Sequence, residues 1–242
     1  MATRYHIGAK QLRGEIGAYA KRFDLLEVQT AGRGPISIAT MRKWRKAVPP
    51  HFEFAAVAGP HVARLLPGDP FEQELAALLA AVETLQARTV VLPTPMEVTP
   101  SRAWRERMRK LLARIPRDAT QVAWEPRGVW EIEDAAVAAQ EWGAVLVVDP
   151  TRDPVPAGPV AFARLPGIGE TRAYGPSALE RVVRAIGPRR EAYVVLETPT
   201  ALAECKRLRA LAQGSTRRVA GGTARIIRPR AASVRVSDDE QE

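Results

Sequence analysis

The alternation of short apolar runs with amphipathic segments constrains the fold of this chain more than any other feature. Eight runs have the length and composition of strands, at residues 5–8, 24–28, 51–59, 88–94, 121–125, 144–150, 159–167 and 191–198. Helical periodicity appears between most of them, at residues 15–23, 37–46, 71–86, 101–115, 132–142 and 177–186, and again at 199–213. Strands separated by helices pair in parallel through right-handed crossovers.

Eight such units in 242 residues predict a single-domain α/β fold, a (β/α)8 TIM-like barrel. A doubly wound open sheet is the alternative. The glycines after residue 166 lack the third glycine and the immediate helix of a dinucleotide-binding loop. We expect the barrel to span residues 1–213, and residues 214–242 to form a flexible tail that is first arginine-rich and then acidic.

The net charge of +9 raises the question of a polyanionic partner. Arginine supplies most of the positive charge, but aromatic residues are only 6% of the chain. Proteins that bind single-stranded nucleic acid usually interleave aromatic residues with basic ones. The charge favours nucleic-acid binding and the low aromatic content speaks against it. Association with nucleic acid through the arginine-rich surface and tail is therefore the alternative function and not the main prediction.

Cysteine and histidine are too rare for several kinds of site. The single cysteine, Cys205, excludes an internal disulfide, and its place in an apolar helical stripe predicts a core residue. The three histidines have no paired spacing, so we predict no metal and no cofactor. No apolar run reaches the roughly 20 residues that span a bilayer, and the first residues lack the apolar segment of a signal peptide. The expected location is the cytoplasm, with no membrane partner.

Several charged and polar residues stand where predicted strands end, which in a barrel is the face that carries the active site. They are Glu27, Gln29, Glu125, Arg127, Asp149, Arg164 and Glu197. Glu125 or Glu27 is the candidate acid–base group, and two arginines, Arg127 and Arg164, are candidates to hold an anion bidentately. The alternative is that these acids and arginines neutralise each other, which we favour for Asp149 and Glu197.

Two carboxylates across the mouth of a barrel could also hydrolyse a glycoside. That chemistry needs a separation of roughly 5–10 Å and a raised pKa on one of the two groups. The sequence cannot supply the distance between Glu27 and Glu125, so this reaction stays open.

Five stretches resemble, in order and context, the YecE-like family (domain of unknown function seventy-two). They are FDLLEVQT, MRKWRKAVPPHFEFAAVAGPH, WEPRGVW, FARLPG and AYVVLET. The resemblance runs from Gly8 to about Leu211 and implies an α/β barrel without a settled reaction. Residues that match the family pattern are Glu27, Trp44, His61, Glu125, Arg127, Trp130, Arg164 and Gly167.

Other positions depart from that pattern. Gln29 replaces the usual asparagine, Val57 stands near the usual lysine, Gly128 and Pro166 replace histidines, and Glu197 with Thr198 replaces an asparagine pair. The resemblance therefore implies a divergent member, either a specialised one or one that has lost part of the family's site.

The function we expect is the binding or processing of an anionic or sugar-like small molecule at the carboxyl-end mouth of the barrel. The resemblance adds His61 and Trp130 to its expected ligand contacts. The sequence leaves open whether the protein is an enzyme or a binding relative, and it does not predict an oligomeric state.

Overall fold

The computed structural model describes residues 3–12, 14–32, 35–167 and 173–221. Eight parallel strands form one closed barrel in the order β1 to β8. The strands are β1 (Arg4–Ala9), β2 (Leu25–Gln29), β3 (Glu53–Val57), β4 (Thr89–Thr94), β5 (Gln121–Pro126), β6 (Val145–Val148), β7 (Val160–Leu165) and β8 (Glu191–Leu196). The predicted TIM-like barrel is confirmed, and the open-sheet alternative is wrong.

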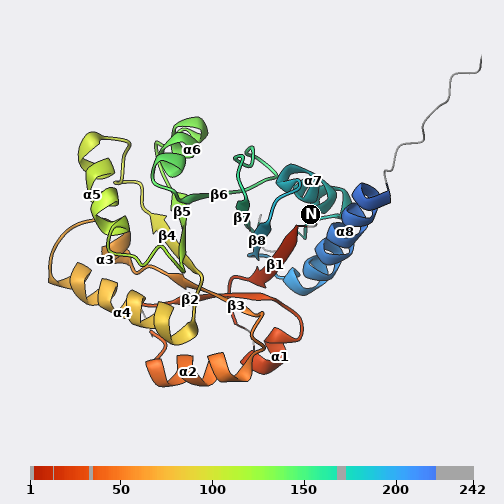
Figure 1. The fold of residues 1–242 in the computed structure, drawn as a ribbon, viewed down its shortest axis with the longest axis horizontal. Coiled ribbons are helices and arrows are strands. Elements are labelled where there is room, and N and C mark those ends of the chain that lie inside the picture. Colours follow the sequence, from red (N-terminus) through yellow and green to blue (C-terminus); the bar gives the residue numbers. More distant parts are fainter. Residues whose placement is uncertain (1–2, 13, 33–34, 168–172, 222–242) are drawn as a thin grey trace, which may run out of the picture.

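Helices cover the outside of the barrel (Figure 1). They are α1 (Ile16–Ala20), α2 (Ile38–Ala47), α3 (Pro60–Ala63), α4 (Asp69–Leu85), α5 (Arg102–Leu112), α6 (Ile132–Glu141), α7 (Pro176–Ile186) and α8 (Ala201–Gly221). The connection from β6 to β7 is described throughout and contains no helix.

Two elements differ from the expectation. The segment around His61, predicted as a loop, contains the short helix α3. The carboxylate of Glu74, on α4, accepts hydrogen bonds from the backbone N–H groups of His61 and Val62 at 2.7 and 3.1 Å. This satisfies the first turn of α3 from a distant part of the chain, which local sequence cannot reveal.

Helix α8 is the second difference, because it continues to Gly221 instead of ending at Gln213. The first part of the expected flexible tail is therefore helical. Residues 222–242, which hold the remaining arginines and the acidic end, lie outside the described residues.

Pairing of β1 with β8 closes the barrel, with His6 opposite Tyr193 and Gly8 opposite Val195. On its other side β1 pairs with β2, and Gly8 lies opposite Leu25. A Cβ atom on Gly8 would come within 2.2 Å of the Leu25 carbonyl oxygen. Glycine is therefore required at this point of the barrel wall.

Alternation along the strands divides the buried residues into two cores. The outer core packs the barrel against the helices and includes Phe52, Phe54 and Cys205. Cys205 is buried as predicted, and burial raises the pKa of its thiol to about 12. The inner core fills the barrel and consists of Leu25, Ala55, Val57, Val91, Ala123, Val147, Val160, Phe162, Tyr193 and Val195.

Among the described residues, the helices are all too short or too polar to cross a membrane.

Candidate functional site

One arginine at the carboxyl end of the barrel contacts three carboxylates. Arg164 donates from Nη2 and Nη1 to the two carboxylate oxygens of Glu27, at 2.7 and 3.0 Å. Its Nη1 atom also donates to Glu197 at 3.0 Å, and its Nε atom lies 3.0 Å from Glu125 Oε2. We call these four residues the Arg164 hub.

The strand pattern explains why these four side chains meet. Each of them stands two positions after a residue of the inner core: Glu27 after Leu25, Glu125 after Ala123, Arg164 after Phe162 and Glu197 after Val195. Because side chains two apart in a strand point to the same side of the sheet, the hub forms the next layer above the apolar interior. Charged residues in this layer face the mouth of the barrel.

Arg164 is held firmly in its charged form. Burial opposes the charge, but the adjacent carboxylates, Glu27 foremost, outweigh it and raise the pKa of the guanidinium. The contact between Nε and Glu125 is an ion pair without hydrogen-bond geometry, since Nε has no hydrogen-bond partner among the described residues. Glu125 is thus held less tightly than Glu27, which receives two hydrogen bonds.

The surroundings of Glu125 change the pKa of its carboxyl group. Burial raises the pKa of its carboxyl group, and the nearby Glu27 and Glu197 charges act in the same direction. Arg164 and Arg127 act against the rise without cancelling it. A carboxyl group with a raised pKa at the mouth of a barrel can carry a proton closer to neutral pH than an ordinary glutamate.

Two exposed cations flank the hub. Arg127, whose side chain is 63% exposed, places Nη2 3.8 Å from Glu125 Oε1. Lys10, whose side chain is 50% exposed, places Nζ 3.1 Å from Glu197 Oε2. These cations are open to solvent and can reach an anionic ligand, whereas Arg164 is only 13% exposed.

The other predicted ligand contacts lie apart from the hub's own contacts. Trp130 donates its indole N–H to the Val98 carbonyl at 2.7 Å and packs edge to face on Trp124. His61 is exposed on α3, and Gln29 is exposed at the end of β2. Asp149 accepts hydrogen bonds from the backbone and hydroxyl of Thr151 at 3.0 and 2.7 Å, a local turn that occupies one of its oxygens.

Lys10 is the residue at the mouth that the sequence analysis missed. A signal for it exists, because it stands two positions after Gly8, which pairs with Leu25 and Val195 of the inner core. The four hub residues each stand two positions after an inward-facing residue. The same rule, applied to Gly8, places Lys10 at the carboxyl end of β1 on the inner side of the sheet.

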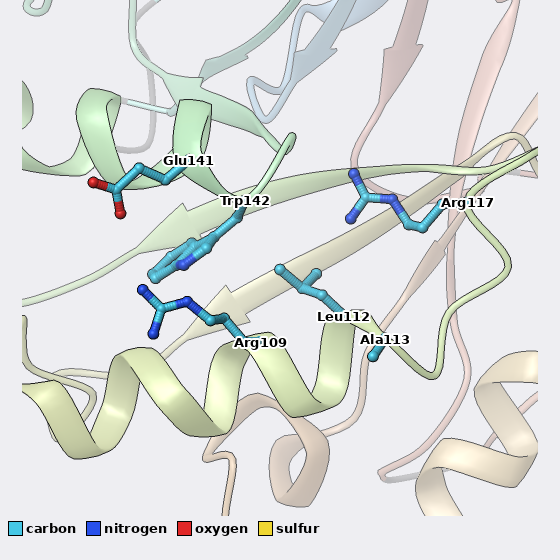
Figure 2. A pocket seen from close by; sticks show the side chains of 6 residues that line it. All are labelled: Arg109, Leu112, Ala113, Arg117, Glu141 and Trp142. Carbon is cyan, nitrogen blue, oxygen red and sulfur yellow. The ribbon is translucent and has the colours of Figure 1, made fainter.

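Hollows among the described residues lie in different parts of the molecule. A crevice of about 600 Å³ adjoins the hub and is lined in part by Lys10 and Glu197. A wider one of about 1020 Å³ lies at the amino ends of the strands, beside Glu53 and Arg88. Figure 2 shows a third, of about 450 Å³ between α5 and α6, where Arg109 lies beside Trp142. The first of these alone contains predicted site residues.

Within the described part of the chain, no three His, Cys, Asp or Glu side chains are grouped so that they could hold a metal ion. The prediction of a metal-free and cofactor-free site stays a prediction. The nucleic-acid alternative also stays one, because arginines at positions 225–235 lie outside the described residues.

A family model described as "Protein of unknown function DUF72" matches residues 2–228. The chain belongs to the DUF72 family. The resemblance stated from the sequence is thereby confirmed. No match was found among functionally curated proteins.

Solved structures of DUF72 proteins have the same fold. One from Enterococcus faecalis superposes with a TM-score of 0.71 at 16% identity, over 87% of this chain and 98% of that one. Another, from Thermotoga maritima, gives 0.66 at 16% identity, over 87% and 99%. A structure of an L-ribulose 3-epimerase gives 0.57 at 14% identity, over 93% and 99%. At such low identities these likenesses establish the fold alone.

Proposed function

We propose that this DUF72 protein binds and processes an anionic, sugar-like small molecule at the carboxyl-end mouth of its barrel, and that Glu125 exchanges a proton with it. One observation carries the proposal. Glu125 has a carboxyl pKa raised by burial, and the exposed cation Arg127 lies beside it. A proton carrier next to an exposed cation is what acid–base work on an anionic substrate needs.

Glu125 suits this role better than Glu27. The Glu27 side chain is 4% exposed, and both of its oxygens accept hydrogen bonds from Arg164. Glu125 is 18% exposed and is held by an ion pair without a hydrogen bond to Arg164. We therefore assign proton transfer to Glu125 and a positioning role to Glu27, which fixes Arg164.

Arg164 takes a different role from the anion clamp expected from the sequence. Its Nη atoms are occupied by Glu27 and Glu197, and its Nε atom faces Glu125. It positions the carboxylates, and the two exposed cations beside the hub, Arg127 and Lys10, become the candidate anion contacts. The two carboxylates that glycoside hydrolysis would use, Glu27 and Glu125, both contact the Arg164 guanidinium, so we favour proton transfer by Glu125 alone over that reaction.

One solved structure with this fold is an L-ribulose 3-epimerase, a different protein whose name gives a sugar as its substrate. A sugar-like ligand is therefore compatible with a barrel of this kind. The proposal rests on the side chains of this chain.

The test is proton exchange in deuterated water. Ribulose 5-phosphate and fructose 6-phosphate carry an acidic C–H bond beside a carbonyl, so Glu125 acting as a base would replace that hydrogen with deuterium. We expect the wild-type protein to catalyse this exchange with at least one of the two, measured by proton NMR. Glu125→Gln should slow exchange by about 100-fold or more while leaving the dissociation constant, measured by calorimetry, nearly unchanged.

Glu131→Gln is the matched control, since Glu131 is an exposed glutamate just before α6 and outside the hub. It should exchange at the wild-type rate. Exchange that persists in Glu125→Gln removes Glu125 from the proposed role. Ligand binding without exchange in the wild type would make the protein a binding relative and not an enzyme.

A further inference from the structure

The crevice beside the Arg164 hub has an apolar floor and a charged rim. It lies at the carboxyl ends of β1 and β8, between α1 and the beginning of α8, and Figure 1 shows α8 starting close to β1. Phe23, Leu196 and Leu202 contribute apolar surface. The charged and amide side chains that line it are Lys10, Gln11, Glu15, Arg22 and Glu197.

Glu197 belongs both to the crevice and to the hub. Its Oε1 atom accepts a hydrogen bond from Arg164 at 3.0 Å, and its Oε2 atom lies 3.1 Å from Lys10 Nζ. Charges of alternating sign therefore cross the mouth from Arg127 through Glu125, Arg164 and Glu197 to Lys10. The two ends of this row are exposed cations, and its middle is buried.

We propose that the crevice receives the anionic end of the ligand and that Lys10 is the cation that binds it. The ligand is then a polyhydroxylated molecule with a phosphate or carboxylate at one end. That end lies against Lys10, and the rest extends along the row toward Glu125. This inference rests on the proposed function and adds an orientation to it.

The position of the Lys10 backbone and the donors of its ammonium group both suit binding of an anion. Its backbone N–H donates to the Leu196 carbonyl at 3.0 Å, which continues the pairing of β1 with β8 and fixes where the side chain begins. Its ammonium group has three N–H donors, and among the described residues Glu197 is its salt-bridge partner. An anion can therefore bind Lys10 without breaking that ion pair.

The remaining lining suits hydroxyl groups. Gln11 and Glu15 offer donors and acceptors at the rim, while the floor is apolar enough to exclude water from one side of a bound ligand. The volume of about 600 Å³ is in the range of small-molecule sites.

The experiment compares ribose 5-phosphate, gluconate and ribose by calorimetric titration. For the wild type we expect the two anions to bind more tightly than ribose, and the tighter of them identifies phosphate or carboxylate as the recognised group. Lys10→Met should weaken binding of that anion by about 10- to 100-fold and change ribose binding by less than about 3-fold. Lys10→Arg should restore part of the loss.

Lys21→Met is the matched control, because Lys21 is exposed at the end of α1 and does not line the crevice. It should bind all three molecules as the wild type does. Acetylation of Lys10, read by peptide mass spectrometry, gives an independent measurement. The bound anion should protect Lys10 and leave Lys21 reactive.

The outcomes separate this inference from the proposed function. If Lys10→Met binds the anion normally and Lys10 is not protected, the crevice is not the anion subsite, while binding at the mouth stands. If the wild type binds none of the three molecules, nor the two ketose phosphates of the exchange experiment, the proposed function and this inference fail together.

Discussion

The two ends of the barrel hold their buried charges in different ways. At the carboxyl end a single arginine, Arg164, contacts three carboxylates. At the amino end Arg88 contacts one, Glu53, through its Nε and Nη2 atoms. The first arginine is largely buried, and the second is about half exposed.

The amino end also buries a neutral histidine. His6 stacks on Tyr193 with ring centroids 4.7 Å apart. Burial lowers the pKa of its imidazole to about 3, and the nearby charges of Arg4, Arg88 and His51 act in the same direction. Protonation is therefore disfavoured at His6, whereas at Glu125 on the opposite end it is favoured.

The charges at the amino end neutralise each other without help from outside, and those at the carboxyl end do not. Arg88 and Glu53 carry one positive and one negative charge, so that pair is neutral. The hub has more carboxylates than its arginine can neutralise, so its balance depends on the exposed cations Arg127 and Lys10, which a ligand can reach. Barrels of this class use the carboxyl end for function and the amino end for stability, and the charges follow that division.

Removing Arg164 should have the largest effect on stability. Arg164→Ala leaves Glu27 buried without a partner beside two further carboxylates. Breaking a buried ion pair in this way costs about 3–5 kcal/mol, and urea unfolding at neutral pH measures it.

Arg88→Ala is the comparison at the amino end. This substitution leaves one carboxylate, that of Glu53, without its partner, and the Arg88 side chain is about half exposed. The loss in the free energy of unfolding should therefore be clearly smaller than for Arg164→Ala. Equal losses at the two ends would mean that the hub behaves as an ordinary pair. If Arg164→Ala does not fold, Arg164→Lys, which keeps the charge but loses the paired hydrogen bonds, supplies the comparison.

His6→Phe should change how stability depends on pH. The pKa of about 3 keeps His6 neutral in the folded protein down to about pH 3, whereas the unfolded chain protonates it near the ordinary histidine pKa of 6.5. Between these values the unfolded state binds one more proton, so His6 makes stability fall as pH falls, by about 1.4 kcal/mol per pH unit. Phenylalanine keeps the stacking on Tyr193 and cannot titrate.

The variant should therefore lose stability less steeply than the wild type in acid. Urea unfolding from about pH 4 to about pH 7 compares the two slopes. Identical slopes would show that His6 titrates normally and that the amino end tolerates a positive charge.

The fold was predictable because the barrel repeats one simple pattern eight times. Each strand is a short apolar run, and the helices between strands carry apolar residues at helical spacing, so small errors at the boundaries do not change the architecture. Features that depend on distant contacts were not predictable. Helix α3 is capped by Glu74 from another helix, and the residues near His61 in the sequence do not indicate this contact.

The candidate site was predictable only as a set of strand ends. Glu27, Glu125, Arg164 and Glu197 could be named from the sequence, but their meeting at one guanidinium depends on how β2, β5, β7 and β8 are arranged around the closed barrel. Trp130 was included in the predicted site through the resemblance of WEPRGVW to the family. Its side chain packs against Trp124 and Trp142 on the outer side of the wall.

Arg127→Ala should have the smallest effect on stability and still alter the hub. Arg127 is mostly exposed and lies 3.8 Å from Glu125, and surface pairs of this kind contribute about 0–1 kcal/mol. Yet its charge lowers the pKa of Glu125, so its removal should raise that pKa further. Carbon-13 NMR titration of the Glu125 carboxyl measures the shift, with Arg109→Ala for comparison, because Arg109 lies on α5 outside the hub and its side chain is 53% exposed. An unchanged Glu125 titration would detach Arg127 from the hub and leave Lys10 as the exposed cation on which the balance of the hub depends.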